Sequence, residues 1–293
     1  MIIIITLIIA VAQAGGWPYV TDYYRASSVE EMHTLIPPPE SNFLREITLY
    51  SQEVSPPKGV VAQLVSTHEA DIIDMAAAMP EAPSFNKLVW TYARAEPATD
   101  LSAYPVEFQL YAQGAVKLHQ DRSEEASLLF KQLLDLPEGK RQYRSTWAAY
   151  MLARTVLNID EQVSYYNEVI DLVSDGYKDT LGLGTASLRH LARLYFIQER
   201  PDKMTVSCMQ YFASGGNNSP FCKDLERALK QLIDEDIPEQ YADNDIFSNV
   251  ISIYLASNRF KQAGGWIDIL NRRSQNTRGA ALLALAAYQR GEF

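Results

Sequence analysis

Residues 106–137 read VEFQLYAQGAVKLHQDRSEEASLLFKQLLDLP. Apolar side chains recur every three or four positions on both sides of a polar break at 121–123, which is the pattern of two amphipathic helices. We therefore expect helices over 106–120 and 124–136. Pro137 ends the second helix, because proline has no backbone N–H to continue the hydrogen-bond ladder.

Four residues of this stretch have a spacing that is typical of a known helical repeat. Gly114 and Ala126 are small and lie where two antiparallel helices would cross closely, while Phe130 follows one turn later and Pro137 closes the pair. In this spacing the chain resembles the tetratricopeptide repeat (TPR) family, whose period is about 34 residues. The resemblance implies an all-α fold, specifically a TPR-like α-solenoid of antiparallel helix hairpins.

The resemblance covers residues 106–293. Tyr254 and Tyr288 are one period of about 34 residues apart. Longer intervals before them indicate an insertion at 213–245, which is rich in Gly, Asn, Asp and Glu. We expect three further helix pairs, at 147–157 with 161–173, at 186–198 with 202–212, and at 245–257 with 261–271.

The resemblance also implies a binding surface. Stacked hairpins leave a groove lined by the first helix of each pair, and protein or peptide partners bind there in this family. The candidate partner-binding residues on these first helices are Gln109, Lys117, Arg144, Tyr150, Arg154, Arg189, Arg193, Asn249 and Tyr254.

The last helical stretch, Ala280–Tyr288, reads AALLALAAY. The terminal helix of a repeat array normally carries a polar outer face. We therefore expect either that further repeats follow this stretch or that it docks on a partner subunit.

Residues 15–105 form a segment that prolines divide into short pieces. Because proline breaks or begins helices, we expect short helices between the prolines. On the helix expected over 58–79, Asp71 and Asp74 are one turn apart and are expected on a solvated face. The expected helices cover 27–35, 41–53, 58–79 and 84–95.

The N-terminus begins with the apolar run MIIIITLIIAVA at Met1–Ala12. This run is too short for a membrane-spanning helix and is followed by the small-x-small pattern of Ala12 and Ala14. We expect residues 1–14 to be a signal peptide, so that the chain is exported to the periplasm or secreted and keeps no membrane span after cleavage. A buried N-terminal strand or helix is the alternative.

Two cysteines, Cys208 and Cys222, flank a Gly- and Asn-rich loop. In an oxidising compartment such a pair can close into a disulfide, and two independent buried thiols are the alternative. Two cysteines without neighbouring His or acidic partners cannot complete a zinc site. No metal site is therefore expected.

The composition excludes several classes of protein. The 293 residues carry 26 Lys and Arg against 36 Asp and Glu, a formal net charge of −10, and 47% are hydrophobic. Low-complexity disorder and a polytopic membrane protein do not fit these proportions, and the negative charge opposes binding to nucleic acid.

Catalytic motifs are missing from the sequence. The stretch Gly182–Ser187 lacks the lysine of a phosphate loop, and we expect Thr185 to cap the following helix instead. No catalytic residue and no cofactor is expected. The basic run 140–144 is either a solvated loop with Tyr143 in the core or a binding site for an acidic partner peptide.

These observations predict a non-enzymatic protein- or peptide-binding scaffold of the cell envelope. Two other hypotheses stay open. The chain could be the α-superhelical accessory region of a larger envelope enzyme, such as a lytic transglycosylase, or a solute-binding protein that uses its acidic N-terminal segment. The sequence indicates no oligomeric state.

Overall fold

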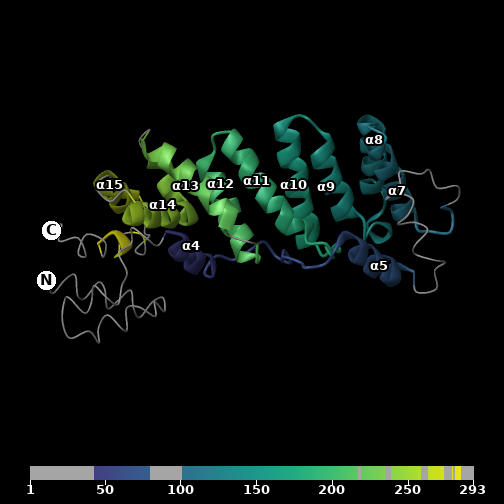
Figure 1. Ribbon diagram of the computed structural model, residues 1–293, viewed down its shortest axis with the longest axis horizontal. Helices are drawn as coiled ribbons and strands as arrows, with labels where there is room; N and C mark the ends of the chain where they lie inside the picture. Colours follow the sequence, from purple (N-terminus) through teal and green to yellow (C-terminus); the bar gives the residue numbers. More distant parts are fainter. Residues whose placement is uncertain are drawn as a thin grey trace. The chain divides into compact units, whose positions relative to one another are not determined.

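The computed structural model describes residues 43–79, 101–216, 219–234, 239–258, 263–273, 279 and 281–284. Every regular element in these ranges is a helix, and no strand occurs in them (Figure 1). The predicted all-α class is therefore confirmed. No helix in this part of the chain has both the length and the apolar character needed to cross a membrane.

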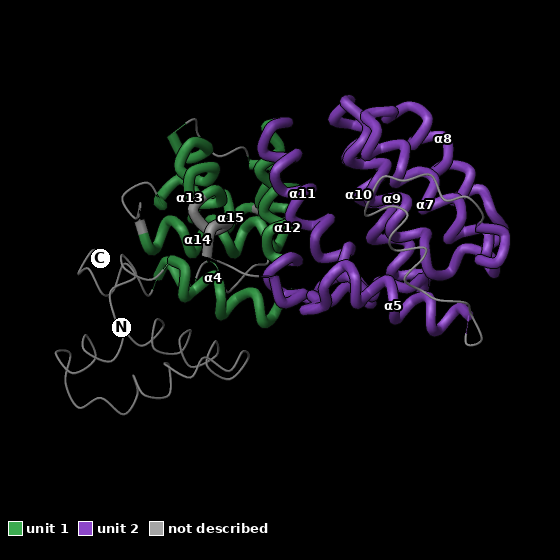
Figure 2. Tube along the Cα trace, turned by 45° about the vertical axis from the view of Figure 1, so that its right-hand side comes forward, with its two compact units in different colours: residues 1–54, 199–209, 217–293 green, residues 55–198, 210–216 purple. Residues whose placement is uncertain are grey.

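The chain divides into two compact units (Figure 2). Unit 1 lies within Met1–Val54, Glu199–Met209 and Asn217–Phe293, and unit 2 lies within Ser55–Gln198 and Gln210–Gly216. The described helices of unit 2 are α5 (Thr67–Ala78), α7 (Val106–His119), α8 (Ser123–Leu134), the 3-10 helix η2 (Glu138–Lys140), α9 (Ser145–Thr155), α10 (Ile159–Ser174) and α11 (Leu183–Ile197). Those of unit 1 are α4 (Phe43–Ser51), α13 (Ser219–Asp234), the 3-10 helix η3 (Glu239–Asp243), α14 (Asp245–Asn258) and α15 (Ala263–Arg273), while α12 (Pro201–Ala213) contributes residues to both.

The helices predicted from residue 106 onwards are found within a few residues of their expected bounds. They are α7, α8, α9, α10, α11, α12, α14 and α15. The helix predicted over 41–53 is α4. Residues 55–79 of the expected N-terminal segment belong to the same compact unit as the hairpins between 106 and 198.

Within unit 2, helices α7 to α11 pack in chain order. Each helix contacts the next, and α9 also contacts both α7 and α11. Figure 1 shows them side by side in this order. Phe130, Trp147, Leu152 and Val169, which come from three successive helices, are almost completely buried in one apolar cluster. The hairpins therefore share a continuous core.

The expected close crossing of α7 and α8 is confirmed. A Cβ atom added to Gly114 would lie 2.6 Å from the Phe130 ring, and Ala126 is fully buried beside it. Glycine is needed here because no side chain fits between the two helices at this point.

The predicted helix over 58–79 is wrong in its first half. Helix α5 starts only after Ser66, whose hydroxyl accepts a hydrogen bond from the Glu69 backbone N–H at 3.2 Å, while the Glu69 carboxylate accepts one from the Ser66 N–H at 3.0 Å. This capping box sets the helix start. In the residues before it, Leu64 is fully exposed, whereas Val60 is buried.

Residues 55–66, which we call the strap, lie against the ends of the hairpins instead. The Ser174 hydroxyl at the end of α10 donates a hydrogen bond to the Lys58 carbonyl at 3.2 Å. The Ala62 N–H donates to the Ser214 carbonyl, just beyond α12, at 2.7 Å. The strap therefore ties together the connections that follow two different helices.

The start of α11 also differs from the expectation. Thr185 lies buried in the first turn and does not cap the helix. Asp179 does so: its carboxylate accepts hydrogen bonds from the backbone N–H groups of Leu183 at 2.6 Å and Gly184 at 2.9 Å. Burial raises the pKa of Asp179, and these N–H donors oppose the rise.

Unit 1 is organised around α14, which contacts α4, α13, η3 and α15. The Trp266 indole N–H of α15 donates to the Ser252 hydroxyl at 3.2 Å, and the Trp266 ring lies edge-on to Phe247 at 6.3 Å between centroids. The segment 213–245, expected as an insertion, contains helix α13 and the short helix η3.

Some expectations fall outside the described residues. These are the signal peptide at 1–14, the helices predicted over 27–35 and 84–95, and most of the apolar stretch at 280–288. They stay predictions.

Candidate functional site

Three aromatic side chains from successive helices meet in unit 2. The rings of Tyr166 (α10) and His190 (α11) are stacked, with centroids 4.9 Å apart and an interplanar angle of 5°. Tyr150 (α9) lies edge-on to Tyr166 at 5.6 Å, and its hydroxyl is 3.0 Å from His190 Nε2. We call Tyr150, Tyr166 and His190 the aromatic floor.

The ionisation of the floor follows from its burial. Burial, together with the smaller effect of the charges on Arg189, Arg154 and Arg193, lowers the pKa of His190 to about 4. Burial likewise raises the pKa of Tyr166 to about 12. The floor is therefore uncharged near neutral pH.

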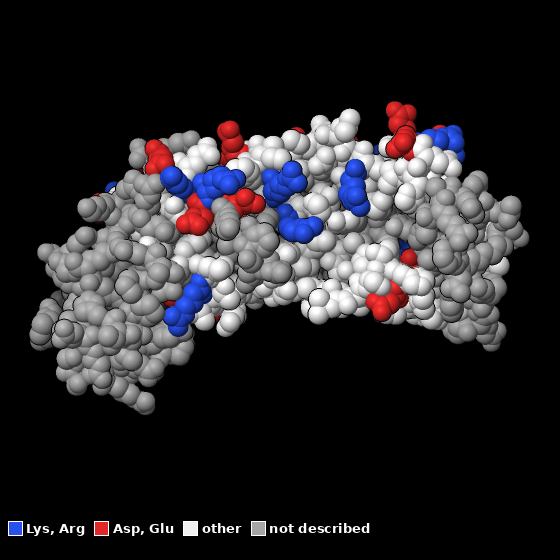
Figure 3. All heavy atoms as spheres, in the orientation of Figure 1, with Lys and Arg blue, Asp and Glu red and all other residues white. Residues whose placement is uncertain are grey.

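Three arginines lie close enough to this floor for their charges to act on His190. Arg154 lies on α9, Arg189 and Arg193 lie one turn apart on α11, and all three side chains are exposed. Within the described ranges none of them makes an ion pair. Figure 3 shows Lys and Arg side chains gathered over α9, α10 and α11 on the face that it draws. We call Tyr150 with these three arginines the basic patch.

The patch is part of the set of residues that the sequence analysis proposed. Two other members of that set lie on α7 and are engaged locally. The Gln109 side chain donates to the Tyr104 carbonyl at 2.6 Å, and the Lys117 ammonium pairs with Glu125 of α8 at 3.0 Å. Neither residue is linked to the aromatic floor by any described contact.

The two candidates on α14 are packing residues of unit 1. Asn249 is 9% exposed, and its amide donates to the Tyr50 hydroxyl at 3.0 Å. Tyr254 is 3% exposed and lies edge-on to Phe43 at 5.4 Å. Both side chains join α14 to α4, so they are not available to a partner in this structure.

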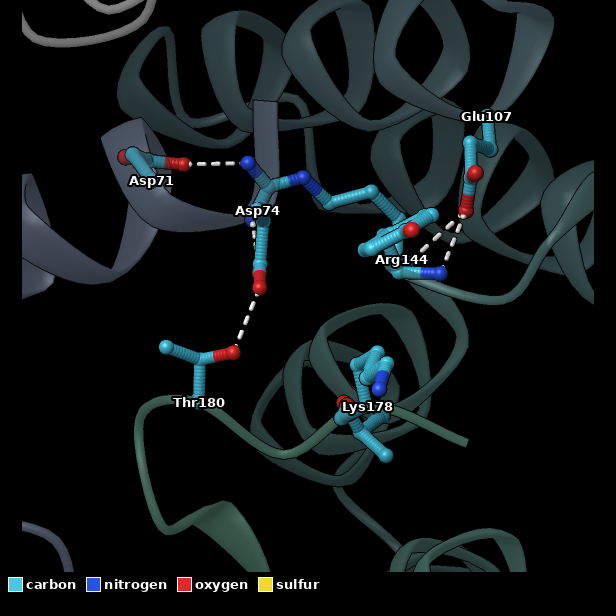
Figure 4. A network of polar contacts seen from close by, with 8 residues as sticks. Asp71, Asp74, Glu107, Arg144, Lys178 and Thr180 are labelled. Carbon is cyan, nitrogen blue, oxygen red and sulfur yellow. Dashed lines mark hydrogen bonds and ion pairs between the residues drawn. The ribbon is translucent and has the colours of Figure 1, made fainter. Parts of the chain in front are cut away.

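Arg144 is the clearest departure from the predicted groove. Its side chain is 1% exposed and pairs with Asp71 at 2.5 Å and with Asp74 at 3.5 Å (Figure 4). The guanidinium also lies over the rings of Phe108 at 4.6 Å and Trp147 at 4.5 Å. A group enclosed in this way cannot reach a partner, so Arg144 is a core residue and the basic run 140–144 ends inside the protein.

The expectation of a solvated face for Asp71 and Asp74 is therefore wrong. Both residues are almost completely buried, and the Thr180 hydroxyl donates to Asp74 at 2.5 Å. Figure 4 shows both carboxylates at the end of the Arg144 side chain, with Thr180 beyond Asp74. Burial raises the pKa of Asp74, while Arg144 and Thr180 favour its ionised form.

Glu107 completes this buried network from α7. Its carboxylate accepts hydrogen bonds from the backbone N–H groups of Tyr143 at 2.9 Å and Arg144 at 2.8 Å, directly before α9 begins. A carboxylate at this point satisfies helix-terminal donors and complements the helix dipole. The network thus joins α5, α7 and α9, and it positions the helix that carries Tyr150 and Arg154.

Comparisons with known proteins find no match. No protein-family model, no curated protein and no solved structure is significantly similar to this chain. The argument about function therefore depends on the site itself. Among the described residues, no group of three or more His, Cys, Asp or Glu side chains is arranged to hold a metal ion.

The predicted disulfide between Cys208 and Cys222 stays a prediction. Cys208 is fully buried on α12, and Cys222 belongs to α13, but its side chain is not among those that the structure describes.

Tyr166, His190 and the acidic partners of Arg144 were not singled out as site residues from the sequence. His190 had one usable signal: it lies between Arg189 and Arg193 on a first helix. No sequence signal indicated the contacts of Arg144, because its partner Asp71 lies 73 residues earlier in the chain. Chemically, the patch presents guanidinium groups beside an uncharged aromatic surface, an arrangement that binds anions.

Proposed function

We propose that this protein is a non-enzymatic, TPR-like helical-repeat scaffold of the cell envelope that binds a protein or peptide partner. The basic patch is the observation that carries the proposal. It lies on α9 and α11, the first helices of two successive predicted hairpins, where the resemblance places the binding surface.

The packing of unit 2 supports this architecture. Because α9 contacts α7 and α11 as well as its own neighbours α8 and α10, the first helices of three pairs form one layer. Such a layer is what a stack of antiparallel hairpins presents to a partner. The location in the envelope depends on the apolar run at Met1–Ala12 and the residues that follow it.

The residues of the patch suit an interface. Tyrosine and arginine are enriched at binding hot spots, because each combines a large contact surface with hydrogen-bonding capacity. Tyr150 is held by its contacts with His190 and Tyr166, so it loses little freedom on binding.

Affinity capture from an envelope extract tests the proposal. The test variant carries Arg154→Ala, Arg189→Ala and Arg193→Ala. The control variant carries Lys131→Ala, Lys140→Ala and Lys178→Ala, which removes the same charge from exposed positions of unit 2 outside the patch. We expect the wild type and the control to recover the same stoichiometric partner and the test variant to lose it. Equal recovery by all three proteins would contradict the proposal.

A further inference from the structure

The basic patch gathers three guanidinium groups on two adjacent helices, and no ion pair within the described ranges neutralises them. The chain has a formal net charge of −10, so acidic side chains are plentiful. Some exposed basic residues of unit 2 do pair with an acidic side chain, as Arg122 does with Glu125. Arg154, Arg189 and Arg193 make no such pair within the described ranges.

The arginines are also spread over two helices. Arg189 and Arg193 are one turn apart, which separates their Cβ atoms by about 6 Å. Arg154 lies on α9, which packs directly against α11. A single small anion cannot contact guanidinium groups spaced in this way as well as a chain that carries several anionic groups.

The floor beneath the arginines adds no charge of its own. His190 is neutral near pH 7 because burial and the arginines lower its pKa to about 4. The positive potential of the patch therefore comes from guanidinium groups, which stay protonated at any physiological pH and form paired hydrogen bonds with carboxylates.

We infer that the basic patch binds an acidic segment of the partner, a stretch of polypeptide with two or more Asp or Glu side chains spaced to reach α9 and α11. This inference rests on the proposed function and names its partner class. The carboxylates pair with Arg154, Arg189 and Arg193, and the aliphatic parts of the segment pack on Tyr150.

Fluorescence anisotropy with labelled synthetic peptides tests the inference on the full chain. The probe is a Glu-rich peptide, and the matched peptide has Gln at every Glu position. At low ionic strength we expect the Glu peptide to bind at least about tenfold more tightly than the Gln peptide. The preference should weaken as salt is added, because exposed charges are screened.

The variants described above assign the binding to the patch. The variant with Arg154, Arg189 and Arg193 changed to Ala should lose the preference for the Glu peptide, and the variant with the three lysines changed should keep it. Because all these side chains are exposed, we expect both variants to melt close to the temperature of the wild type. A thermal melt verifies that both variants are folded.

Two results would overturn the inference. The first is equal binding of the Glu and Gln peptides by the wild type. In that case, partner capture that still depends on the three arginines would support the proposed function, while the peptide result would contradict an acidic segment as the ligand. The second is complete competition by inorganic phosphate at concentrations where glutarate does not compete, which would indicate a phosphate site instead.

Discussion

Arg144 is a core residue that closely resembles a surface residue in the sequence. It ends a basic run, yet its guanidinium is enclosed by two carboxylates and three aromatic rings. Removing only one partner of a buried ion pair is costly, because the remaining charges have neither water nor a counter-ion.

We therefore expect Arg144→Met to lower the free energy of unfolding by about 3–5 kcal/mol. Asp71 and Asp74 would remain buried without the guanidinium that they share. Urea denaturation measures the change. The control is Arg154→Met, an exposed site where the same substitution should cost no more than about 0.5 kcal/mol. Similar costs at the two sites would contradict the assignment of Arg144 to the core.

His190 makes stability depend on pH. Its pKa is lowered to about 4 in the folded protein and is about 6.5 in an unfolded chain, so the unfolded state binds more protons between these values. The stabilisation is present above about pH 6.5 and is lost as the pH falls towards 4.

We expect His190→Gln to remove this dependence. The unfolding free energy of the wild type minus that of the variant should fall as the pH is lowered from about 6.5 to about 4. Denaturation curves at several pH values measure it. If the unfolding free energy of the wild type minus that of the variant stays constant or rises on acidification, the pKa of His190 is not lowered in the folded protein.

Among the residues, the sequence identified the exposed arginines of α9 and α11 but misplaced Arg144, Asn249 and Tyr254. The reason is that one face of a first helix packs in the core and the other is exposed. Sequence spacing shows that α14 is apolar, but it does not show which of its polar side chains reach solvent.

Among the helices, the prediction of the individual helices from residue 106 onwards succeeded because turns and capping residues separate strongly periodic segments. It failed at 58–66. There the apolar residues Val60, Val61, Leu64 and Val65 allow a helical pattern, but the capping box at Ser66 starts the helix later. The bonds of the strap to Ser174 and Ser214 link it to distant parts of the sequence, so no local pattern indicates them.

The close crossing of α7 and α8 predicts the effect of adding one methyl group at Gly114. We expect Gly114→Ala to cost about 1–3 kcal/mol, because the added Cβ would lie 2.6 Å from the Phe130 ring and force the helices apart. Gly139→Ala is the control, since a Cβ there meets nothing within 4 Å. Thermal or urea denaturation compares them, and equal stability of the two variants would refute the close crossing.

At the scale of the whole molecule, the expected export of the chain to an oxidising compartment gives a prediction for its two cysteines. If export occurs, Cys208 and Cys222 should form a disulfide that closes a loop of about 15 residues and stabilises the chain by about 3 kcal/mol. Mass spectrometry of exported protein, with and without reductant, measures the bond. Two free thiols in material purified from the envelope would show that the cysteines are independent.

The composition and helix periodicity were sufficient to predict the fold class, but the partner is not encoded in any motif. Only the three-dimensional packing shows that Tyr150 and Arg154 of α9 lie close to His190 of α11, because α10 separates these two helices along the chain. For this reason the central claim concerns one surface: a partner binds across α9 and α11.

Site-specific photo-crosslinking tests this claim most directly. A photoreactive phenylalanine analogue replaces Phe196, a 38% exposed aromatic residue one turn beyond Arg193 on α11, or Leu128, a 61% exposed residue of the second helix α8. In cells we expect a crosslinked partner from position 196 and none from position 128, with the crosslink lost when Arg154, Arg189 and Arg193 are changed to Ala. A partner that crosslinks from position 128 and not from position 196 would contradict the account.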